Sequence, residues 1–302
     1  MTKIEWTHRP GTKGESWNMV GGCTKVSPGC DNCYALSMSW RIQNMEKRPE
    51  RYEGVIAKVL SDIVYPPYEE ELHWTGRINL DYDALEIPYR WKKPRTVFVC
   101  SMADLFHEQV PYGFILSTFK VMYDNPQHTF LILTKRARRM LKIVKAHFHS
   151  ELQGVGLEWR LHWPFPNAWL GVTAENQEQA DLRIPLLLQA PAAVKTVSVE
   201  PMLGPVDLIK SIFKPGIWDA IHPDHNYALA PSLHGSGLDW VIIGCESGPN
   251  RRPMELEWAL DLVRQCDAAK VAVFVKQLPI NGRVSHDPNE WPAELQRREY
   301  PK

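Results

Sequence analysis

The chain has 302 residues, of which 44% are hydrophobic and 23% are charged, a balance that is typical of a soluble globular protein and excludes a disordered chain. Its 35 Lys and Arg residues are balanced by 35 Asp and Glu residues, which disfavours a protein that coats nucleic acid by neutralising phosphates, while a local basic groove is still compatible. Because the sequence has neither a run of about 18 apolar residues nor an N-terminal apolar signal segment, we expect no membrane span and a cytoplasmic location.

Short β-branched apolar runs recur along the chain and predict buried strands. The expected strands cover residues 16–20, 96–100, 129–133, 168–172, 195–199, 240–244 and 271–275. Since most of these runs are apolar without alternation, they indicate a parallel sheet covered on both faces. Helical spacing of apolar residues follows over 112–124, 177–188 and 255–269. Six or seven such βα units predict one α/β domain over residues 1–302, built as a complete or partial barrel.

Three long segments do not fit this repeating unit and are interpreted as insertions. They cover about 41–75, 145–167 and 208–238, and the last two are rich in His, Trp, Pro and Gly. We expect a short helix and a break at Pro66-Pro67 in the first. The last is expected to be a lid or substrate loop.

Polar residues follow every predicted strand, where a parallel barrel carries its active site. In chain order they are Cys23 to Cys33, Ser101 to Asp104, Thr134 to Arg136, Thr173 to Asn176, Glu200, Glu246 to Gly248, and Lys276-Gln277. Any one of them can be explained as the cap of the next helix. Their recurrence at seven strand ends predicts an enzyme.

The densest motif is Cys23-x6-Cys30-x2-Cys33, in a loop with Gly21-Gly22 and Pro28-Gly29. In a cytosolic protein such thiols are ligands, nucleophiles or core residues rather than disulfides. A zinc site needs a fourth ligand, which only Cys100 or a distant His offers, and a redox C-x2-C does not need the third cysteine. Three thiolates suit a [4Fe–4S] cluster with one iron open to a small molecule, which is our leading interpretation.

These residues resemble a phage-type radical S-adenosylmethionine (SAM) family, long catalogued as phage proteins of unknown function. The resemblance covers most of the chain. It rests on Ile4-Glu5-Trp6-Thr7, Trp17-Asn18, the cysteine motif with Tyr34-Ala35, Thr75-Gly76-Arg77-Ile78, Trp91 to Arg95, Ser101 to His107, Ile132 to Arg136, Leu170 to Gln177, Ser198 to Asp207, Gly244 to Pro249 and Phe274 to Gln277. Cys245 departs from the family pattern, which has Gly there, and we expect it to be a core or pocket-wall residue.

The resemblance implies a partial (β/α)6-like radical SAM barrel with insertions and a [4Fe–4S] cluster on Cys23, Cys30 and Cys33. S-adenosylmethionine binds the fourth iron in such enzymes, and an external electron donor reduces the cluster to yield a 5′-deoxyadenosyl radical. The cysteine spacing differs from the C-x3-C-x2-C of most members of the superfamily.

Roles for the SAM-binding residues follow from their positions in this resemblance. Ser101 and Asp104 are expected to hold the methionyl ammonium, and Lys135 or Arg136 its carboxylate. The residues expected at the ribose hydroxyls are Thr173, Glu175 and Asn176. Tyr34 is expected to pack near the cluster or the adenine, or simply on its helix face.

The later strand ends are expected on the substrate side. Glu200, Glu246 and Lys276 are the candidate catalytic residues there, with Ser247 and Gln277 beside them. The expected substrate is a modified or damaged nucleobase in DNA, with the rearrangement of an amino-acid-substituted thymidine as the specific reaction considered. The basic runs at 135–139 and Arg251-Arg252 are candidates for binding phosphate.

Two alternatives stay open. One is a radical SAM enzyme acting on a peptide or small metabolite, although only Cys266 lies beyond residue 250, so an auxiliary cluster is not expected. The other is a zinc-stabilised, non-enzymatic DNA-binding phage protein, which leaves the polar strand ends unexplained.

Overall fold

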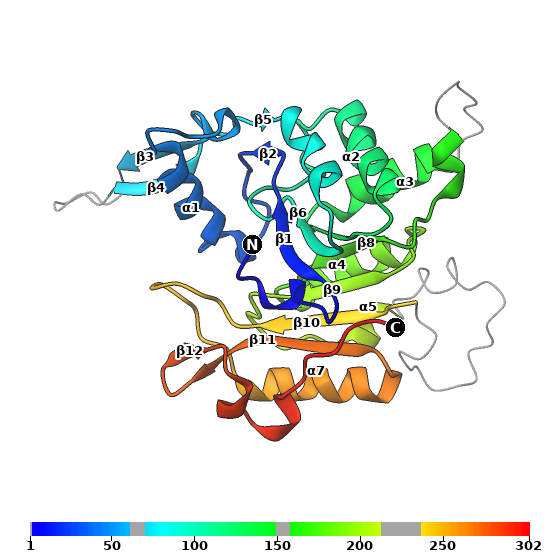
Figure 1. Cartoon of the computed structure of the whole chain (residues 1–302). Coiled ribbons are helices and arrows are strands. Elements are labelled where there is room, and N and C mark those ends of the chain that lie inside the picture. Colours follow the sequence, from blue (N-terminus) through cyan, green and yellow to red (C-terminus); the bar gives the residue numbers. More distant parts are fainter. Residues whose placement is uncertain (1, 61–69, 149–157, 213–236) are drawn as a thin grey trace.

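The computed structural model describes residues 2–60, 70–148, 158–212 and 237–302. Its centre is an eight-stranded sheet in the order β1-β6-β7-β8-β9-β10-β11-β12. The strands are β1 (Lys13–Trp17), β6 (Arg95–Val99), β7 (Thr129–Thr134), β8 (Ala168–Thr173), β9 (Lys195–Val199), β10 (Trp240–Gly244), β11 (Ala272–Ile280) and β12 (Arg283–Ser285). All neighbours pair in parallel except β11 and β12, which form an antiparallel hairpin. The sheet curls into a half-barrel (Figure 1).

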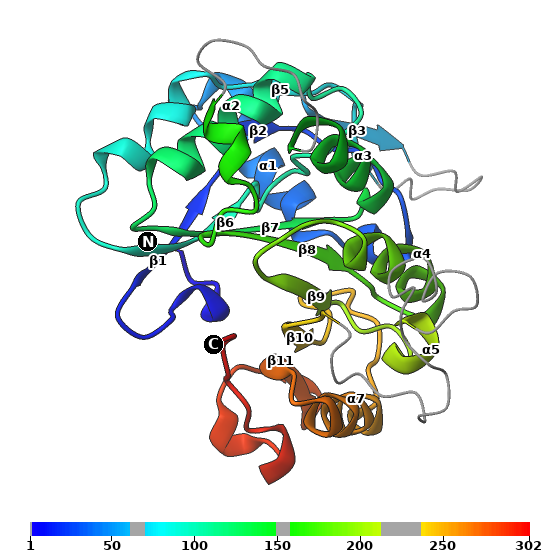
Figure 2. The same cartoon turned by 90° about the vertical axis from the view of Figure 1, so that its right-hand side faces the viewer.

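Helices cover the outer face of this half-barrel (Figure 2). They are α2 (Tyr112–Asp124), α3 (Ala137–Phe148), α4 (Gln177–Leu188), α5 (Leu208–Ile212) and α7 (Leu256–Ala269). The main hydrophobic core lies between them and the sheet, with residues such as Phe119, Ile184 and Leu262 fully buried. Helix α1 (Tyr34–Gln43) packs instead in a separate small core with Tyr52 and Val55. The expected mixed α/β architecture with a parallel, curled sheet is therefore confirmed at this coarse level.

The expected strand and helix positions agree closely with the structure. The strand at 195–199, the strand at 240–244 and the helix at 112–124 have the predicted bounds, and β8 and β11 are longer at their C-terminal ends. The first strand begins at Lys13 rather than at residue 16. Its pattern is weak because it contains Gly14 and Glu15 and lies at the sheet edge.

The expected insertions are only partly within the described residues. The first contains the antiparallel hairpin of β3 (Ile56–Leu60) and β4 (Glu70–Trp74) after a 3-10 turn, η3 (Glu50–Tyr52); Pro66-Pro67 lie outside the described residues. A second small pair joins β2 (Val20–Gly21) to β5 (Asn79–Leu80). Most of the expected lid at 208–238 lies outside the described residues, as does 149–157 of the middle insertion.

Aromatic side chains fill one end of the concave face. Trp169, Trp240 and Phe274 meet there with Trp6 from the 3-10 turn η1 (Glu5–Thr7), and Trp6 lies edge-on to Trp240 at a centroid distance of 6.2 Å. Tyr300 joins the same cluster, packing on Trp240 at 5.6 Å. Both ends of the chain therefore run along the open side of the half-barrel (Figure 2). They plug that end and leave a cavity toward the carboxyl ends of the strands.

Within the described residues, none of the helices is both long and apolar enough to cross a membrane.

Candidate active site

A cavity of about 730 Å³ opens at the carboxyl ends of the parallel strands. Its wall includes most of the site residues expected from the sequence. They are Cys23, Cys30, Cys33, Tyr34, Ser101, Asp104, Lys135, Arg136, Thr173, Glu200, Glu246, Ser247, Lys276 and Gln277. Trp6, Phe98 and Leu133 form an apolar floor beneath them. Ligand pockets have volumes of about 300–1,000 Å³ and combine apolar walls with a few polar groups, as this one does.

The cysteines lie on a loop of residues 23–33, which we call the cysteine loop. It follows β2 and leads into α1, and the 3-10 turn η2 (Pro28–Cys30) is its only regular element. The chain enters it through two glycines packed against backbone carbonyls: a Cβ on Gly21 would lie 1.7 Å from the Arg51 oxygen, and one on Gly22 2.0 Å from the Arg77 oxygen. Gly22 also has a φ of +88°, so no other residue fits both requirements.

The cysteine thiols are free, and they share one electrostatic environment. Burial raises the pKa of Cys23 to about 12; Asp104, Cys33 and Cys30 raise it too, while Arg136 opposes them. Burial also raises the pKa of Cys33. The Cys33 thiol therefore stays protonated at neutral pH, whereas a redox C-x2-C pair depends on a lowered thiol pKa. A metal that binds Cys23 and Cys33 has to displace their protons.

The three thiols are the ligand type that an iron–sulfur cluster takes, and they line one cavity. Among the described residues, no three His, Cys, Asp or Glu side chains converge on a common point suited to a metal ion. Of the candidates for a fourth zinc ligand, the Cys100 thiol points to Met19 Sδ at 3.1 Å, and one of the distant histidines, His107, has its Nε2 2.9 Å from Thr24 Oγ1.

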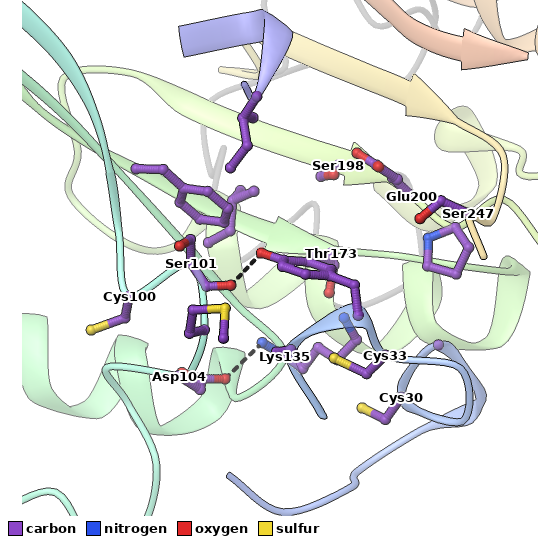
Figure 3. A pocket seen from close by; sticks show the side chains of 18 of the residues that line it. Cys30, Cys33, Cys100, Ser101, Asp104, Lys135, Thr173, Ser198, Glu200 and Ser247 are labelled. Carbon is purple, nitrogen blue, oxygen red and sulfur yellow. Dashed lines mark hydrogen bonds between the residues drawn. The ribbon is translucent and has the colours of Figure 1, made fainter. Parts of the chain in front are cut away.

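Asp104 binds the ends of two strands together. Its carboxylate accepts hydrogen bonds from Thr134 Oγ1 at 2.8 Å, the Lys135 N–H at 3.1 Å and Arg136 Nη1 at 3.2 Å. Because of these contacts, the Asp104 carboxylate has few acceptor positions free to bind a ligand ammonium. The backbone carbonyl of Ser101 accepts a hydrogen bond from the Tyr34 hydroxyl (Figure 3).

Two cavity-lining side chains keep free polar groups for a ligand. The Lys135 ammonium has no hydrogen-bond or ion-pair partner in the part of the chain that the structure describes, and its charge lowers the pKa of Cys33 against the effect of burial. The buried Thr173 hydroxyl likewise has no partner among the described groups. A buried hydroxyl without a partner costs free energy, so a ligand that bonded to it would relieve this cost.

Glu175 and Asn176, expected at the ribose, have other partners. Glu175 is completely buried, forms an ion pair with Arg183 at 2.9 Å and accepts a hydrogen bond from the Gly29 N–H at 3.0 Å. Asn176 caps α4 by accepting from the Gln179 N–H at 3.0 Å. Neither lines the cavity, so the structure places both in supporting roles. The sequence pattern Thr-Ala-Glu-Asn did not distinguish a ligand-facing side chain from a helix cap.

The opposite wall carries two pairs of charged groups. Lys276 and Glu200 form an ion pair, and Glu5 lies 2.5 Å from His286 Nδ1. Burial alone would lower the pKa of Lys276, but the Glu200 carboxylate outweighs it and holds the pKa above the usual range. Figure 3 shows Glu200 and Ser247 across the cavity from Ser101 and Asp104, with Thr173 between them. Cys245 lines this wall, as expected.

The basic runs proposed to bind phosphate are largely engaged inside the protein. Arg136 bonds to Glu108 at 2.8 Å and to Thr24, and Arg139 donates to the Val110 carbonyl at 2.7 Å. Arg251 donates to the Gly282 carbonyl, and Arg252 pairs with Glu246. Arg138 of the first run is exposed, but these four arginines have partners inside the protein, so the local support for a duplex-binding face is weaker than the sequence suggested.

Three residues at the site escaped the sequence argument. Asn32, Arg183 and Arg252 all bond to groups on or beside the cysteine loop. Asn32 was visible only as a spacer between cysteines, and Arg252 only as half of a basic pair. Asn32 and Arg252 contact partners more than 200 residues away in sequence, so nothing local indicated their role, whereas Arg183 pairs with Glu175 only eight positions earlier.

Comparison with known proteins gives one match. The family model described as "Protein of unknown function (DUF5131)" matches residues 1–296. No curated protein and no solved structure matches the chain.

Proposed function

Since the chain belongs to the DUF5131 family, whose description names no activity, we propose its function from its own site: it is a radical SAM enzyme that acts on a modified or damaged nucleobase. In this proposal the half-barrel corresponds to a partial radical SAM barrel. Cys23, Cys30 and Cys33 hold a [4Fe–4S] cluster, and S-adenosylmethionine binds beside it.

The observation that carries the proposal is the position of the three thiols. They share one cavity with a ring of polar groups from strand ends, including Lys135, Thr173 and Glu200. Parallel α/β barrels place their catalytic groups at this end of the sheet. When bound, the cluster and S-adenosylmethionine supply the radical that abstracts a substrate hydrogen, while the protein supplies binding, orientation and exclusion of water.

The cavity-lining residues divide this work. The Lys135 ammonium is placed to bind a carboxylate, and the Thr173 hydroxyl to bond to a ribose oxygen. The apolar floor of Trp6, Phe98 and Leu133 excludes water from beneath a flat base. The Glu200–Lys276 pair on the far wall is placed to orient the substrate and to hold or move a proton.

A substrate smaller than duplex DNA is the second candidate, and one observation favours it. Arg136, Arg139 and Arg252 make internal contacts, so the site has few free cations for a phosphate backbone. A free nucleotide, a metabolite or a peptide fits a neutral protein better than a long duplex does.

The first experiment is anaerobic metal analysis of the purified chain. We expect about four irons and four sulfides per chain, lost in Cys30→Ala and retained in Cys266→Ala, because Cys266 is a buried residue of α7 that does not line the cavity. With dithionite and S-adenosylmethionine, the iron-loaded protein should form 5′-deoxyadenosine. One zinc per chain, no iron and intact S-adenosylmethionine would contradict the proposal and favour the zinc-stabilised binding protein.

A second experiment separates the substrate classes. Thymidine derivatives deuterated on the base substituent are offered as free nucleosides and within duplex DNA. Deuterium in 5′-deoxyadenosine from either form identifies a nucleobase substrate. Transfer from neither, with 5′-deoxyadenosine still formed, directs the search to peptides and metabolites.

A further inference from the structure

The cysteine loop is held from three sides by pairs of arginine and carboxylate. Near Cys23, Arg136 donates to Thr24 Oγ1 at 2.8 Å while it pairs with Asp104 and Glu108. Next to Cys30, the Gly29 N–H donates to Glu175, the partner of Arg183. The third pair, Glu246 and Arg252, contacts the loop at Pro28, Asp31 and Asn32.

Glu246 and Arg252 bind the segment that carries Cys30 and Cys33. Arg252 donates from Nη2 to the Pro28 carbonyl at 2.9 Å and from Nη1 to Asp31 at 3.3 Å. Glu246 Oε2 accepts from Asn32 Nδ2 at 2.8 Å. The same amide of Asn32 donates to the Asn250 carbonyl at 2.8 Å. Loop positions on both sides of Cys30 are therefore tied to the chain that follows β10.

Both carboxylate oxygens of Glu246 already accept hydrogen bonds from the protein. Its side chain is 4% exposed, and the two oxygens accept from the Arg252 guanidinium, the Arg252 N–H at 2.8 Å and Asn32. Burial alone would raise its pKa, but the hydrogen bonds from Arg252 and Asn32 hold the pKa below its usual range. A carboxylate that stays ionised and fully bonded is suited to fixing its neighbours rather than to exchanging protons.

We propose that Glu246 and Arg252 are positioning residues that hold Cys30 and Cys33 in place before any metal binds. This inference rests on the proposed function for its purpose, and it removes Glu246 from the candidate catalytic residues. The cysteine loop has a single 3-10 turn, η2, which ends at Cys30, and no strand pairing. Its conformation therefore depends on side chains supplied by distant parts of the chain, of which Glu246 and Arg252 contact both flanks of Cys30.

The same pair connects the cysteine loop with the substrate side of the cavity. Cys245 and Ser247 flank Glu246 and line the wall opposite Ser101. A ligand that contacts this wall therefore lies next to Glu246, whose carboxylate bonds to Asn32 between Cys30 and Cys33.

The test compares Glu246→Gln, Arg252→Gln and Arg252→Lys with the unchanged full-length chain. Arg264→Gln is the matched control, because Arg264 pairs with Glu257 on the exposed face of α7. In the metal-free protein we measure amide hydrogen exchange over residues 24–33 and the rate at which iodoacetamide alkylates Cys30 and Cys33. We expect the exchange rate and the alkylation rate to rise about tenfold in the two Gln variants, because the loop loses charged hydrogen bonds that hold it locally. In the Arg264→Gln control both rates should stay unchanged.

Arg252→Lys keeps the positive charge, but a lysine can bond to fewer of the partners of Arg252. Its exchange and alkylation rates should therefore lie between those of the unchanged chain and those of Arg252→Gln. After anaerobic reconstitution, the Gln variants should bind less iron than the control or give an altered cluster EPR signal. Unchanged exchange and alkylation in all variants would overturn the proposal, as would equal changes in the control. If the unchanged chain takes up no iron while the loop rates still rise, the proposed function fails and the positioning role remains.

Discussion

At the scale of single residues, the site depends on buried charges that are paired. Glu175 is fully buried and Arg183 has a side-chain exposure of only 6%. Breaking such a pair leaves an uncompensated charge in the interior, and this cost exceeds the net gain that the intact pair contributes.

Glu175→Leu should therefore lower the free energy of unfolding by about 3–5 kcal/mol, measured by denaturant titration. The comparison is Glu257→Leu, whose exposed pair with Arg264 contributes at most about 1 kcal/mol. Replacing both Glu175 and Arg183 with apolar residues should recover part of the loss. If Glu175→Leu lowers the free energy of unfolding by less than about 1 kcal/mol, the Glu175–Arg183 pair is not needed to hold Gly29.

Histidine protonation gives a second residue-scale prediction. Burial and the neighbouring Arg136 lower the pKa of His107, whereas an unfolded histidine titrates near about 6.5. The unfolded chain therefore binds a proton more readily than the folded one, so this contribution to stability is complete above about pH 6.5 and is lost as the pH falls toward the folded pKa. The melting temperature should fall from pH 7.5 to pH 5.5, and less steeply in His107→Gln. Equal slopes in the two proteins would exclude His107 as a cause.

At the scale of elements, the curl of the sheet requires close contact between neighbouring strands. Gly171 in β8 faces Leu133 of β7 and Thr196 of β9. A Cβ there would lie 2.5 Å from Leu133 Cδ2 and 2.9 Å from the Thr196 carbonyl oxygen. The small residue allows the cavity floor to pack without spreading the strands.

Gly171→Ala should therefore destabilise the protein by about 1–3 kcal/mol, as overpacking does. The matched control is Gly113→Ala in α2, where a Cβ meets nothing within 4 Å, and there we expect a gain of about 0.4–1 kcal/mol from the reduced entropy of the unfolded chain. Thermal unfolding of both variants tests the prediction. Two changes of the same sign would contradict it.

At the scale of the whole molecule, the two ends of the chain complete the half-barrel. The Glu299 carbonyl accepts a hydrogen bond from Trp240 Nε1 at 2.9 Å, and the Glu299 N–H donates to Val273 at 2.8 Å. Tyr300 packs on Phe274 at a centroid distance of 5.6 Å. The last residues therefore stabilise the sheet edge next to Trp6.

Deleting residues 297–302 should lower the free energy of unfolding by about 3 kcal/mol or more, since it removes an aromatic side chain and several buried hydrogen bonds. Faster proteolysis of the N-terminal segment should accompany it, because Trp6 loses part of its packing. Deleting only the exposed Lys302 is the control and should leave both measurements unchanged. Similar stability for the two deletions would contradict this role of the terminus.

The sequence predicted the sheet well because buried parallel strands are continuous apolar runs. It missed the short strands β2, β5 and β12, which depend on tertiary contacts. It also missed the five-residue strands β3 and β4, which lie in a segment whose sequence indicates an insertion with a short helix. At the site, position at a strand end predicted which residues line the cavity, including Lys135 and Thr173. It did not separate Glu175, which points to the cysteine loop, from residues that face the cavity. That distinction depends on contacts such as Gly29 to Glu175, between residues far apart in the chain.

The contact between Asn32 and Glu246 also has a consequence for the order of synthesis. More than 200 residues separate them, so at about 5–20 residues per second a ribosome completes the cysteines about 10–40 s before it reaches the glutamate that holds them. During that interval the thiols are attached to a nascent chain without their supporting partners. The cysteine loop can therefore reach the conformation seen in the structure only after synthesis has passed Arg252, late in the production of the chain.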